Sequence, residues 1–547
     1  MPDRIESFKV ICRGGLNSNE NSLDLAENDP GAATRLVNYE PSLFGGYRRI
    51  EGFEPYDTDY PEVDDGNGVA EGKVLCVAFF RNEDLGNPYV IAARKDVGTD
   101  TYSFWKHVPL VGWEKMNTGL SQATTDGSRT VDKIRHVQFD FGDGNKIAFV
   151  DGVNPAKIFD GTDWYELDSS GAGTSVDPGG PQIVDAPELI DVFENHLFLG
   201  GDRTSKSVVC HSAPNDPFNF TSGAGAGQLP VGFNVVQFKP FRDNLFVFGP
   251  NAIKKITPEI QAGFVVDQVT ANVGCIARDS VQEIGGDLVF LAPDGLRPVA
   301  GTSRIGDVEL ETISKPIQGR LLEIISENDL DTLNGVVVRS KSQVRYFIGD
   351  DSNNTIDSIG LIGGLTNRGG SIEWEYGDLL GIRASCTSSE YIGREEYILH
   401  GDYNGKVYRQ EQGVSFDGTD IVSIYSTPFL DFGDTEIRKV LHKINTFIRA
   451  EGPFTLNLSL AYDWGDPDII RPSAYQQSST GAPVVFGGRS VTYGGDNVQY
   501  GGSSVPVMLS DLQGSGRSAR ATFVTQGQTA PHSIQGLVFE FSLAGRR

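Results

Sequence analysis

The sequence has few residues that perform chemistry and few that are basic. Among 547 residues there are 5 Cys, 7 His and 3 Met, and 46 Lys plus Arg stand against 73 Asp plus Glu, a formal net charge of −27. A chain this acidic is not expected to wrap nucleic acid, because phosphate binding needs clustered cations. The negative charge can serve solubility alone. Alternatively, acidic residues can line a passage through which DNA slides without binding, because like charges repel.

The five cysteines indicate neither a disulfide framework nor a zinc site. Cys12, Cys76, Cys210, Cys275 and Cys386 lie far apart, contain no Cys-x-x-Cys pair and are odd in number. Three of them, Cys76, Cys210 and Cys275, have apolar neighbours and are predicted to be small core residues. We therefore expect the chain to fold in a reducing cytosol.

Long apolar runs and helix signals are also scarce. Residues 1–6 show no secretory signal, and no stretch approaches the roughly 18 apolar residues of a membrane helix. Apolar spacing predicts one helix over 317–325 and a short one over 32–38. Glycine is abundant, with 66 residues, and aromatic residues make up 10%. This composition favours short strands and tight turns, so we predict an all-β protein.

A repeated hairpin unit organises the middle of the chain. Each copy has a polar turn, a short apolar strand, a second turn and a second strand, and the first strands are centred on Ile147, Leu197, Leu245, Leu288 and Ile398. The first four centres lie roughly 43 to 50 residues apart, a spacing typical of propeller blades. A weaker copy at 344–359 fills the longer gap before Ile398, and residues 73–93 form a first copy.

These repeats predict an irregular β-propeller of about six or seven blades over residues 71–415. A single small sheet leaves its faces and edges open, whereas radial stacking of several sheets buries the faces. A set of β-sandwiches is the rival arrangement. Residues 1–70 form a separate N-terminal segment with an acidic, exposed loop at 54–72. Longer alternation over 416–547 predicts a C-terminal β-sandwich, similar to a jelly roll.

The predicted sandwich contains a Gly/aromatic loop at residues 484–502. Phe486, Tyr493 and Tyr500 recur every seven residues, and two glycines follow each ring. Paired glycines argue against a heptad helix. The three rings form a candidate contact surface for a partner chain or a glycan, or they pack on their own sandwich, and both interpretations stay open.

No motif marks a catalytic or metal centre. The histidines show no His-x-x-x-His or His-x-His spacing, although His196 and His211 could approach each other within one hairpin unit. Three loops come near to known motifs but are interpreted as structural turns: 140–145 lacks the closing Glu of an EF-hand, 401–406 is too short for a phosphate loop, and 160–164 has the wrong spacing for a sialidase Asp box. Trp164 is predicted to pack inside a blade. We predict no cofactor, no metal and no enzymatic activity.

Both ends of the chain carry motifs that resemble one protein family. Near the N-terminus these are Gly14-Gly15-Leu16-Asn17, Asp24-Leu25, Asn38-Tyr39-Glu40 and residues 46–53 (GYRRIEGF). Near the C-terminus they are residues 429–434 (FLDFGD), Arg438-Lys439, Tyr462-Asp463-Trp464, 514–518 (GSGRS) and 544–547 (AGRR). Their order resembles the tail nozzle, or tail tubular, proteins of short-tailed bacteriophages.

The resemblance implies a structural protein of the virion tail, made in the host cytoplasm. It implies a cyclic homo-oligomer, usually of six copies, placed below the portal and the tail adaptor protein, with tail fibres or tailspikes attached around it. Genomic DNA is held in the lumen and passes through it during ejection at the host cell surface, without sequence-specific binding. The acidic composition leads us to expect acidic or neutral residues at the lumen.

Two other functions stay open. A receptor- or glycan-binding tail propeller would use the loop with Tyr493 and Tyr500, and glycan-array binding would favour it. A propeller glycosidase or depolymerase would use two carboxylates, and loss of cleavage on substituting one Asp or Glu would favour that function. The polar segment 473–480 (SAYQQSST) could line a constriction of the conduit.

Overall fold

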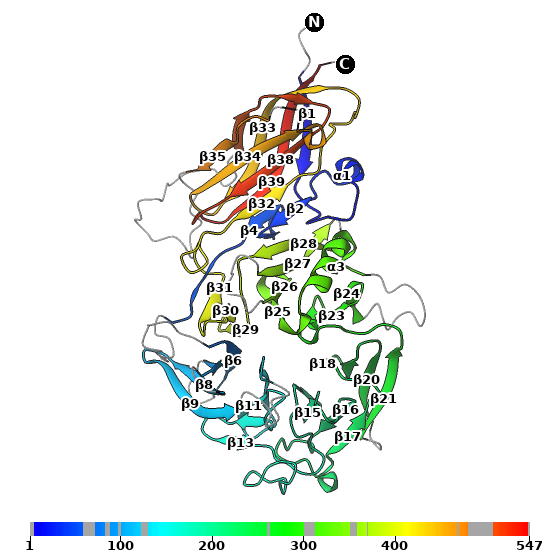
Figure 1. Cartoon of the computed structure of the whole chain (residues 1–547), viewed down its shortest axis with the longest axis vertical. Coiled ribbons are helices and arrows are strands. Elements are labelled where there is room, and N and C mark those ends of the chain that lie inside the picture. The colour runs from blue at the N-terminus through cyan, green and yellow to red at the C-terminus, as the bar shows by residue number, and fades with distance from the viewer. Residues whose placement is uncertain are drawn as a thin grey trace.

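The fold is described from a computed structural model that covers residues 5–57, 72–81, 88–96, 100–121, 130–259, 263–299, 312–349, 358–368, 370–467, 469, 471–479 and 507–544. The molecule is elongated, with a ring of small sheets at one end and a two-sheet sandwich at the other (Figure 1). Helices are short, as in α1 (Ser22–Asn28) and α3 (Gln318–Glu327). The all-β prediction is confirmed.

Of the two predicted helices, the one at 317–325 is present as α3, but the one at 32–38 is wrong. Residues Arg35–Val37 form strand β2, which pairs with β32 (Ser423–Ser426). The helix lies earlier in the chain as α1, where Asn21 caps the first turn by accepting a backbone hydrogen bond. Pairing with a distant strand therefore overrides the local spacing at β2.

Six sheets of three or four strands stand alone around the ring. They are β6 (Val74–Phe80), β7 (Tyr89–Lys95), β8 (Thr101–Val108) and β9 (Gly112–Ser121); β10 (Arg135–Asp140), β11 (Asn145–Val150), β12 (Lys157–Phe159) and β13 (Trp164–Glu166); β14 (Leu189–Phe193), β15 (His196–Gly200), β16 (Val208–His211) and β17 (Gly227–Pro230); β18 (Gln237–Phe241), β19 (Asn244–Phe248), β20 (Ile253–Glu259) and β21 (Gly263–Thr270); β22 (Gln282–Ile284), β23 (Asp287–Ala292) and β24 (Gly295–Pro298); and β29 (Cys386–Ile392), β30 (Glu395–Gly401), β31 (Val407–Gln410) and β5 (Phe53–Pro55).

A further four-stranded unit completes the ring between β22–β24 and β29–β31. It consists of β25 (Leu333–Val338), β26 (Gln343–Ile348), β27 (Ile359–Arg368) and β28 (Ser371–Leu380). Apolar side chains of neighbouring sheets interleave around the ring, and the last sheet meets the first through Cys386, Leu399 and Val74. The predicted irregular propeller is confirmed.

The predicted repeat coincides with the second strand of its sheet in every copy except the first, which begins with β6, the first strand of its sheet. The repeat centres Ile147, Leu197, Leu245, Leu288 and Ile398 lie in β11, β15, β19, β23 and β30, and all five are buried. The weaker copy that begins at Val344 lies in β26, the second strand of its unit. The repeat is visible in the sequence because this strand packs against both neighbouring sheets and must be apolar throughout.

A strand from the N-terminal segment closes the propeller. In β5, Phe53 is paired with Gln410 of β31, so β5 supplies the outermost strand of the last sheet. The Phe53 ring stacks on Phe416 at a centroid distance of 5.0 Å and meets Tyr408 edge-on at 4.8 Å. Residues 54 and 55, the predicted start of the exposed loop at 54–72, therefore belong to a blade.

The C-terminal sandwich is also confirmed, and it takes strands from both ends of the chain. One sheet contains β3 (Tyr39–Pro41), β4 (Tyr47–Arg49), β39 (His532–Leu543), β33 (Lys439–Ala450) and β36 (Val507–Asp511), with β1 (Ile5–Ile11) beside β39 and β37 (Ser515–Gly516) beside β33. The facing layer contains β2, β32, β38 (Ala519–Thr525), β34 (Phe454–Tyr462) and β35 (Tyr475–Ser479). The core between the layers includes Ile444, Leu458, Phe523 and Phe539.

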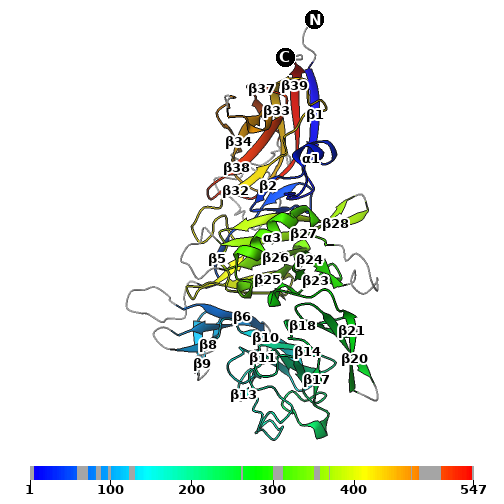
Figure 2. The ribbon, with the colours of Figure 1, turned by 45° about the vertical axis from the view of Figure 1, so that its right-hand side comes forward.

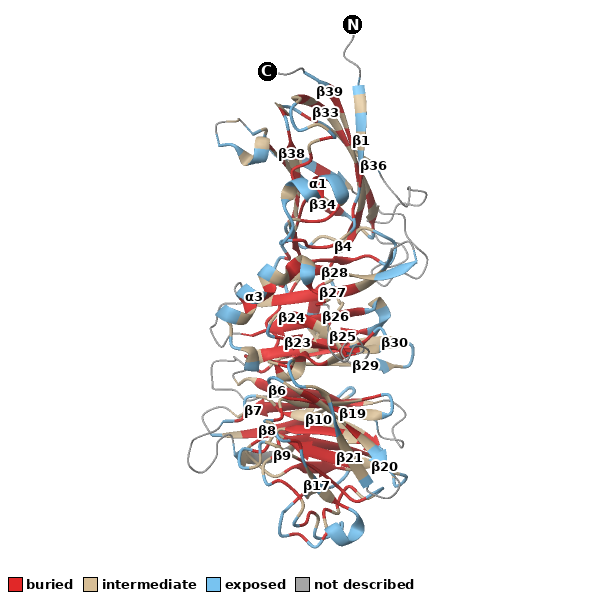
Figure 3. Cartoon of the chain, turned by 90° about the vertical axis from the view of Figure 1, so that its right-hand side faces the viewer, coloured by how far each residue is buried: buried red, intermediate tan, exposed pale blue. Residues whose placement is uncertain are grey.

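The propeller and the sandwich share one sheet. Strand β28 pairs with β2, and β2 pairs with β32, so nine strands run from β25 in the ring to β35 in the sandwich. In Figure 1 and Figure 2, β2 and β32 lie next to each other just above β28. Buried residues occur throughout both parts of the molecule (Figure 3). The two parts are therefore joined by backbone hydrogen bonds and packing, in addition to the chain connections.

Candidate functional site

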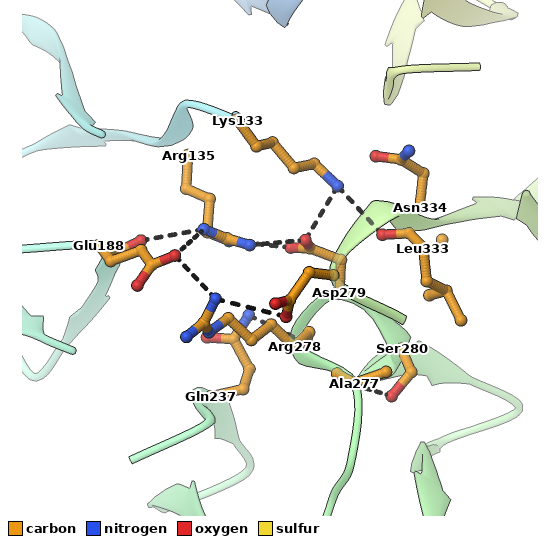
Figure 4. Close-up of polar contacts among 12 residues, drawn as sticks. Lys133, Arg135, Glu188, Gln237, Ala277, Arg278, Asp279, Ser280, Leu333 and Asn334 are labelled. Atoms are coloured by element: carbon orange, nitrogen blue, oxygen red, sulfur yellow. Dashed lines mark hydrogen bonds and ion pairs between the residues drawn. The ribbon is translucent and has the colours of Figure 1, made fainter. Parts of the chain in front are cut away.

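Charged side chains from several blades meet near the centre of the propeller (Figure 4). Asp279 accepts hydrogen bonds from Arg135 Nε at 3.0 Å, Arg135 Nη2 at 2.8 Å and Lys133 Nζ at 2.9 Å. Glu188 accepts a hydrogen bond from Arg278 Nη1 at 2.8 Å and lies 3.7 Å from Arg135 Nη1. We call these five residues, Lys133, Arg135, Glu188, Arg278 and Asp279, the axial cluster.

The blade topology explains why residues so far apart in sequence meet here. Arg135 opens β10, Glu188 precedes β14, and Asp279 precedes β22, and each of these is the first strand of its sheet. The next sheet adds a related pair, in which Lys239 of β18 contacts Asp191 of β14 at 2.9 Å. First strands line the centre of a propeller, so their polar ends converge.

The electrostatics of the axial cluster are those of a satisfied ion-pair network. Burial alone would raise the pKa of Asp279, but Arg135 and Lys133 hold that pKa well below its usual range. Burial lowers the pKa of Lys133, although Asp279 offsets part of this effect. A carboxylate held in its ionised form by two cations is a poor proton donor near neutral pH. The cluster therefore fits a structural role better than acid catalysis.

A cavity of about 460 Å³ opens beside the axial cluster. Its lining includes Arg203, Lys206 and the cluster residues Glu188 and Arg278, together with Asp331. Arg278 Nη1 lies 2.8 Å from Glu188 and 3.7 Å from Asp331. Both carboxylates thus contact one guanidinium, whereas a glycosidase needs an acid and a second carboxylate facing each other across the substrate.

The loops that come near to known motifs are structural turns. Asp140 accepts hydrogen bonds from two glycine N–H groups of its own turn, at 2.7 and 3.2 Å. Asp402 accepts hydrogen bonds from the backbone N–H groups of Asn404 and Lys406, at 2.9 and 2.7 Å. Within the part of the chain that the structure describes, no group of three or more His, Cys, Asp and Glu side chains could hold a metal ion.

His196 and His211 approach each other as predicted, with ring centroids 5.2 Å apart. The Nδ1 atoms of both rings lie within hydrogen-bonding distance of the Ser212 carbonyl oxygen, at 2.7 and 3.0 Å. Phe264 packs against both rings, and burial lowers both pKa values. The pair is therefore part of the packing between its blade and the next, because Phe264 lies on β21. Trp164 also packs against blade aromatics, as predicted.

All five cysteines are free and buried, which confirms the core placement of Cys76, Cys210 and Cys275. Burial raises the pKa of the Cys210 thiol to about 12 and that of Cys275 to about 11. Nucleophilic thiol chemistry needs the thiolate, so these pKa values argue against it. No helix among the described residues is long and apolar enough to cross a membrane.

The predicted contact residues Phe486, Tyr493 and Tyr500 lie outside the described residues, so their role stays a prediction. In the polar segment 473–480, residues Tyr475–Ser479 form β35. Its Gln477 is buried and donates a hydrogen bond to Ser510 Oγ at 2.9 Å.

A second charged cluster, which the sequence analysis missed, lies between propeller and sandwich. Glu40 accepts hydrogen bonds from Arg48 Nη1 at 2.8 Å, Lys341 Nζ at 2.7 Å and Arg345 Nη2 at 2.9 Å. Glu411 contacts Arg345 Nη2 at 2.5 Å and also pairs with Lys341. The side chains of Glu40 and Arg345 are 1% and 2% exposed. We call these five residues, Glu40, Arg48, Lys341, Arg345 and Glu411, the junction cluster.

The junction cluster joins three sheets. Glu40 and Arg48 lie on β3 and β4 of the sandwich, Arg345 lies on β26 of the propeller, and Glu411 directly follows β31. Burial alone would raise the pKa values of both glutamates, but Lys341 and the arginines hold both below their usual range. No local pattern predicts this cluster, because Glu40 and Arg345 are 305 positions apart in the chain.

Motif segments from the two chain ends pack together in the sandwich. The Asp463 carboxylate accepts a hydrogen bond from the Arg517 backbone N–H at 2.5 Å, which joins two C-terminal motifs. The Phe429 N–H donates a hydrogen bond to Ser22 Oγ at 3.1 Å, next to the N-terminal motif of residues 24–25. The residues that carry the family resemblance thus belong largely to one structural unit.

Comparison with known proteins gives only distant likenesses. No protein-family profile matches this sequence, and no curated protein matches it. A crystal structure of BBS1N in complex with ARL6DN is 10% identical over 67% of this chain and 99% of that chain, with a TM-score of 0.37. A glycoside hydrolase family 43 arabinoxylan arabinofuranohydrolase from Bacillus subtilis is 10% identical over 89% of this chain and 99% of that chain, with a TM-score of 0.25. Likenesses this distant do not bear on what the chain binds or catalyses.

Proposed function

We propose that this chain is a structural subunit of a bacteriophage tail, of the nozzle class, and helps to build the DNA conduit below the portal and adaptor proteins. The observation that carries the proposal is the nine-stranded sheet that runs from the propeller into the sandwich. The junction cluster reinforces the same boundary with buried ion pairs. A conduit wall must hold its shape under load, and a shared sheet with a buried polar network opposes hinge motion between two domains.

Two further features support this role. The family-like motifs of both chain ends lie mostly in the sandwich, and the net charge of −27 suits a passage that DNA must leave quickly. In this proposal the copies form a ring, usually of six, and fibres or tailspikes attach around it. The chain then has no catalytic role. We expect no binding of duplex DNA at physiological salt in a fluorescence-anisotropy titration.

The proposal is tested by finding the chain in assembled particles. Phage particles that carry an affinity tag on this chain are purified, their tails are released, and native mass spectrometry determines the copy number. We expect a fixed cyclic multiple that co-purifies with the adaptor. A chain that is missing from particles, or present as single copies, would contradict the proposal.

A second candidate function is a receptor- or glycan-binding propeller, favoured by the cavity of about 460 Å³ beside the axial cluster. Lys206 and Arg278 in its lining would suit an acidic sugar. The test is a glycan array with the full chain and with Lys206→Ala. Binding that the substitution abolishes supports this function, whereas the absence of binding to acidic glycans argues against it.

A further inference from the structure

Two strands occupy opposite edges of the first sandwich sheet. Its central order is β1, β39, β33 and β36, and no strand among the described residues pairs with the outer side of β1 or of β36. Figure 1 shows β1 at one side of the sandwich. An unpaired strand edge offers a row of backbone donors and acceptors, which is a template for another strand.

Both edge strands expose large apolar side chains on the outer face of the sheet. On β1, Ile5 is 63% and Ile11 is 48% exposed; on β36, Val507 is 43% and Leu509 is 65% exposed. The alternate side chains of each strand point inward and pack on the sandwich core. Exposed apolar residues gathered on the edges of one sheet are typical of an interaction surface.

We infer that β1 of one copy pairs with β36 of the next, so that the sheet continues from copy to copy. Every adjacent pair in the series β1, β39, β33 and β36 is antiparallel, so the two edge strands run in opposite directions. A second copy rotated about an axis along the strands therefore brings its β1 antiparallel to β36. This contact joins two different surfaces, the β1 edge of one copy and the β36 edge of its neighbour. Such contacts form a closed ring when the rotation from one copy to the next divides a full turn evenly. The inference that the copies close into a ring depends on the proposed function. The inference that β1 pairs with β36 depends only on the two strand edges described above.

Side-chain chemistry selects one register for this pairing. When Asp511 lies opposite Lys9 of the next copy, antiparallel geometry places Leu509 opposite Ile11. The Asp511 side chain is 91% exposed, and Lys9 is also exposed. The register thus forms one pair of opposite charges and one apolar pair, and both kinds of pair stabilise adjacent antiparallel strands.

Disulfide cross-linking of the full-length chain tests this register. The variant carries Ile11→Cys and Leu509→Cys, and the five native cysteines are buried, so mild oxidation reports on the new thiols. We expect a reductant-sensitive ladder of multimers. Each single variant should give dimers at most. The matched control combines Leu509→Cys with Leu110→Cys, whose site lies fully exposed in the β8–β9 turn and should give no ladder.

A charge swap provides a second test that does not depend on thiol geometry. Asp511→Lys or Lys9→Asp alone should weaken self-association about fivefold, and the two together should restore it, as measured by analytical ultracentrifugation. Both side chains are exposed, so an unchanged melting temperature shows that the fold is intact. Particles that contain cyclic multimers without the 11–509 cross-link would overturn the pairing and leave the proposed function standing. A chain that is monomeric in solution and in particles would overturn both.

Discussion

The propeller and the sandwich differ in how they use the chain. A blade such as β10 to β13 is built from one short stretch of sequence, and it shares separate apolar clusters with the sheet before it and the sheet after it. The sandwich pairs β1 with β39, so its main sheet joins the two ends of the chain around one large core. The two parts are held together at their boundary by long-range contacts, namely the pairing of β28 with β2 and the junction cluster. The predictions below perturb one part or that boundary.

The largest expected effect is the response to acid, which should affect the propeller more than the sandwich. Burial lowers the pKa of His136 to about 4, and the pKa values of His400 and His532 to about 3. Each ring stays neutral in the folded chain but takes up a proton on unfolding below its ordinary pKa of about 6.5. Stability is therefore lost as pH falls below about 6.5. We expect a loss of about 5 kcal/mol between pH 7 and 5.

Urea unfolding followed by tryptophan fluorescence measures this loss. Two of the three rings, His136 and His400, lie in propeller sheets, so about two thirds of the effect should arise there. His532→Phe should reduce the pH dependence by about one third. Leu110→Ala, at a fully exposed turn position that does not titrate, is the control and should leave the pH dependence unchanged. A free energy of unfolding that does not change between pH 7 and 5 would contradict the lowered pKa values of the three buried histidines.

The next effect separates the two parts at their boundary. Arg345→Met leaves Glu40 and Glu411 buried with a partner missing, which should lower the free energy of unfolding by about 3–5 kcal/mol. Because the cluster joins the two parts, we also expect their unfolding transitions to move apart in a calorimetric scan. Arg394→Met, in the exposed β29–β30 turn, is the control and should change stability by less than about 0.5 kcal/mol. Equal effects of the two variants would argue against a role for the cluster.

The third prediction concerns strand β5, which closes the propeller. Phe53→Ala removes the buried ring that stacks on Phe416. This substitution should lower the free energy of unfolding by about 3–4 kcal/mol, and the propeller should lose more stability than the sandwich. Phe44→Ala is the matched control from the same N-terminal segment. The Phe44 ring is 66% exposed, and the Arg449 Cζ atom lies 3.5 Å from the ring centroid. Loss of this ring should lower the free energy of unfolding by about 1 kcal/mol at most. A comparable loss in both variants, measured by urea unfolding, would show that β5 does not close the ring.

The smallest effect concerns the axial cluster alone. Asp279→Asn removes the negative charge to which both Lys133 and Arg135 bind. This substitution should lower the free energy of unfolding by about 2–3 kcal/mol. The folded pKa of Asp279 lies below its usual value, so its contribution is present above about pH 4 and fades in stronger acid. The variant should therefore match the parent chain more closely at low pH. Glu114→Gln, at an exposed pair with Lys106, is the control and should change stability by less than about 0.5 kcal/mol. A larger change in this control would contradict the interpretation that burial makes the Asp279 pairs matter.

The sequence reveals the propeller more readily than the sandwich for a physical reason. Ile147 and its repeat partners are buried by strands that follow within a few tens of residues, so the pattern recurs along the chain. By contrast, β2 and β5 are three residues long and depend on partners hundreds of positions away, which no local spacing encodes. The same holds for the axial pair of Arg135 and Asp279, which lie 144 positions apart. Charge composition indicates that ion pairs form, but only the topology shows which ones.

The most direct test of the proposed role is electron cryomicroscopy of assembled tails, at a resolution that traces strands. We predict several copies of this chain in a closed ring on the tail axis, each as one rigid body, with DNA or its path at the centre. Copies found singly on peripheral appendages, or a ring whose lumen is lined by Arg and Lys, would contradict the proposed conduit.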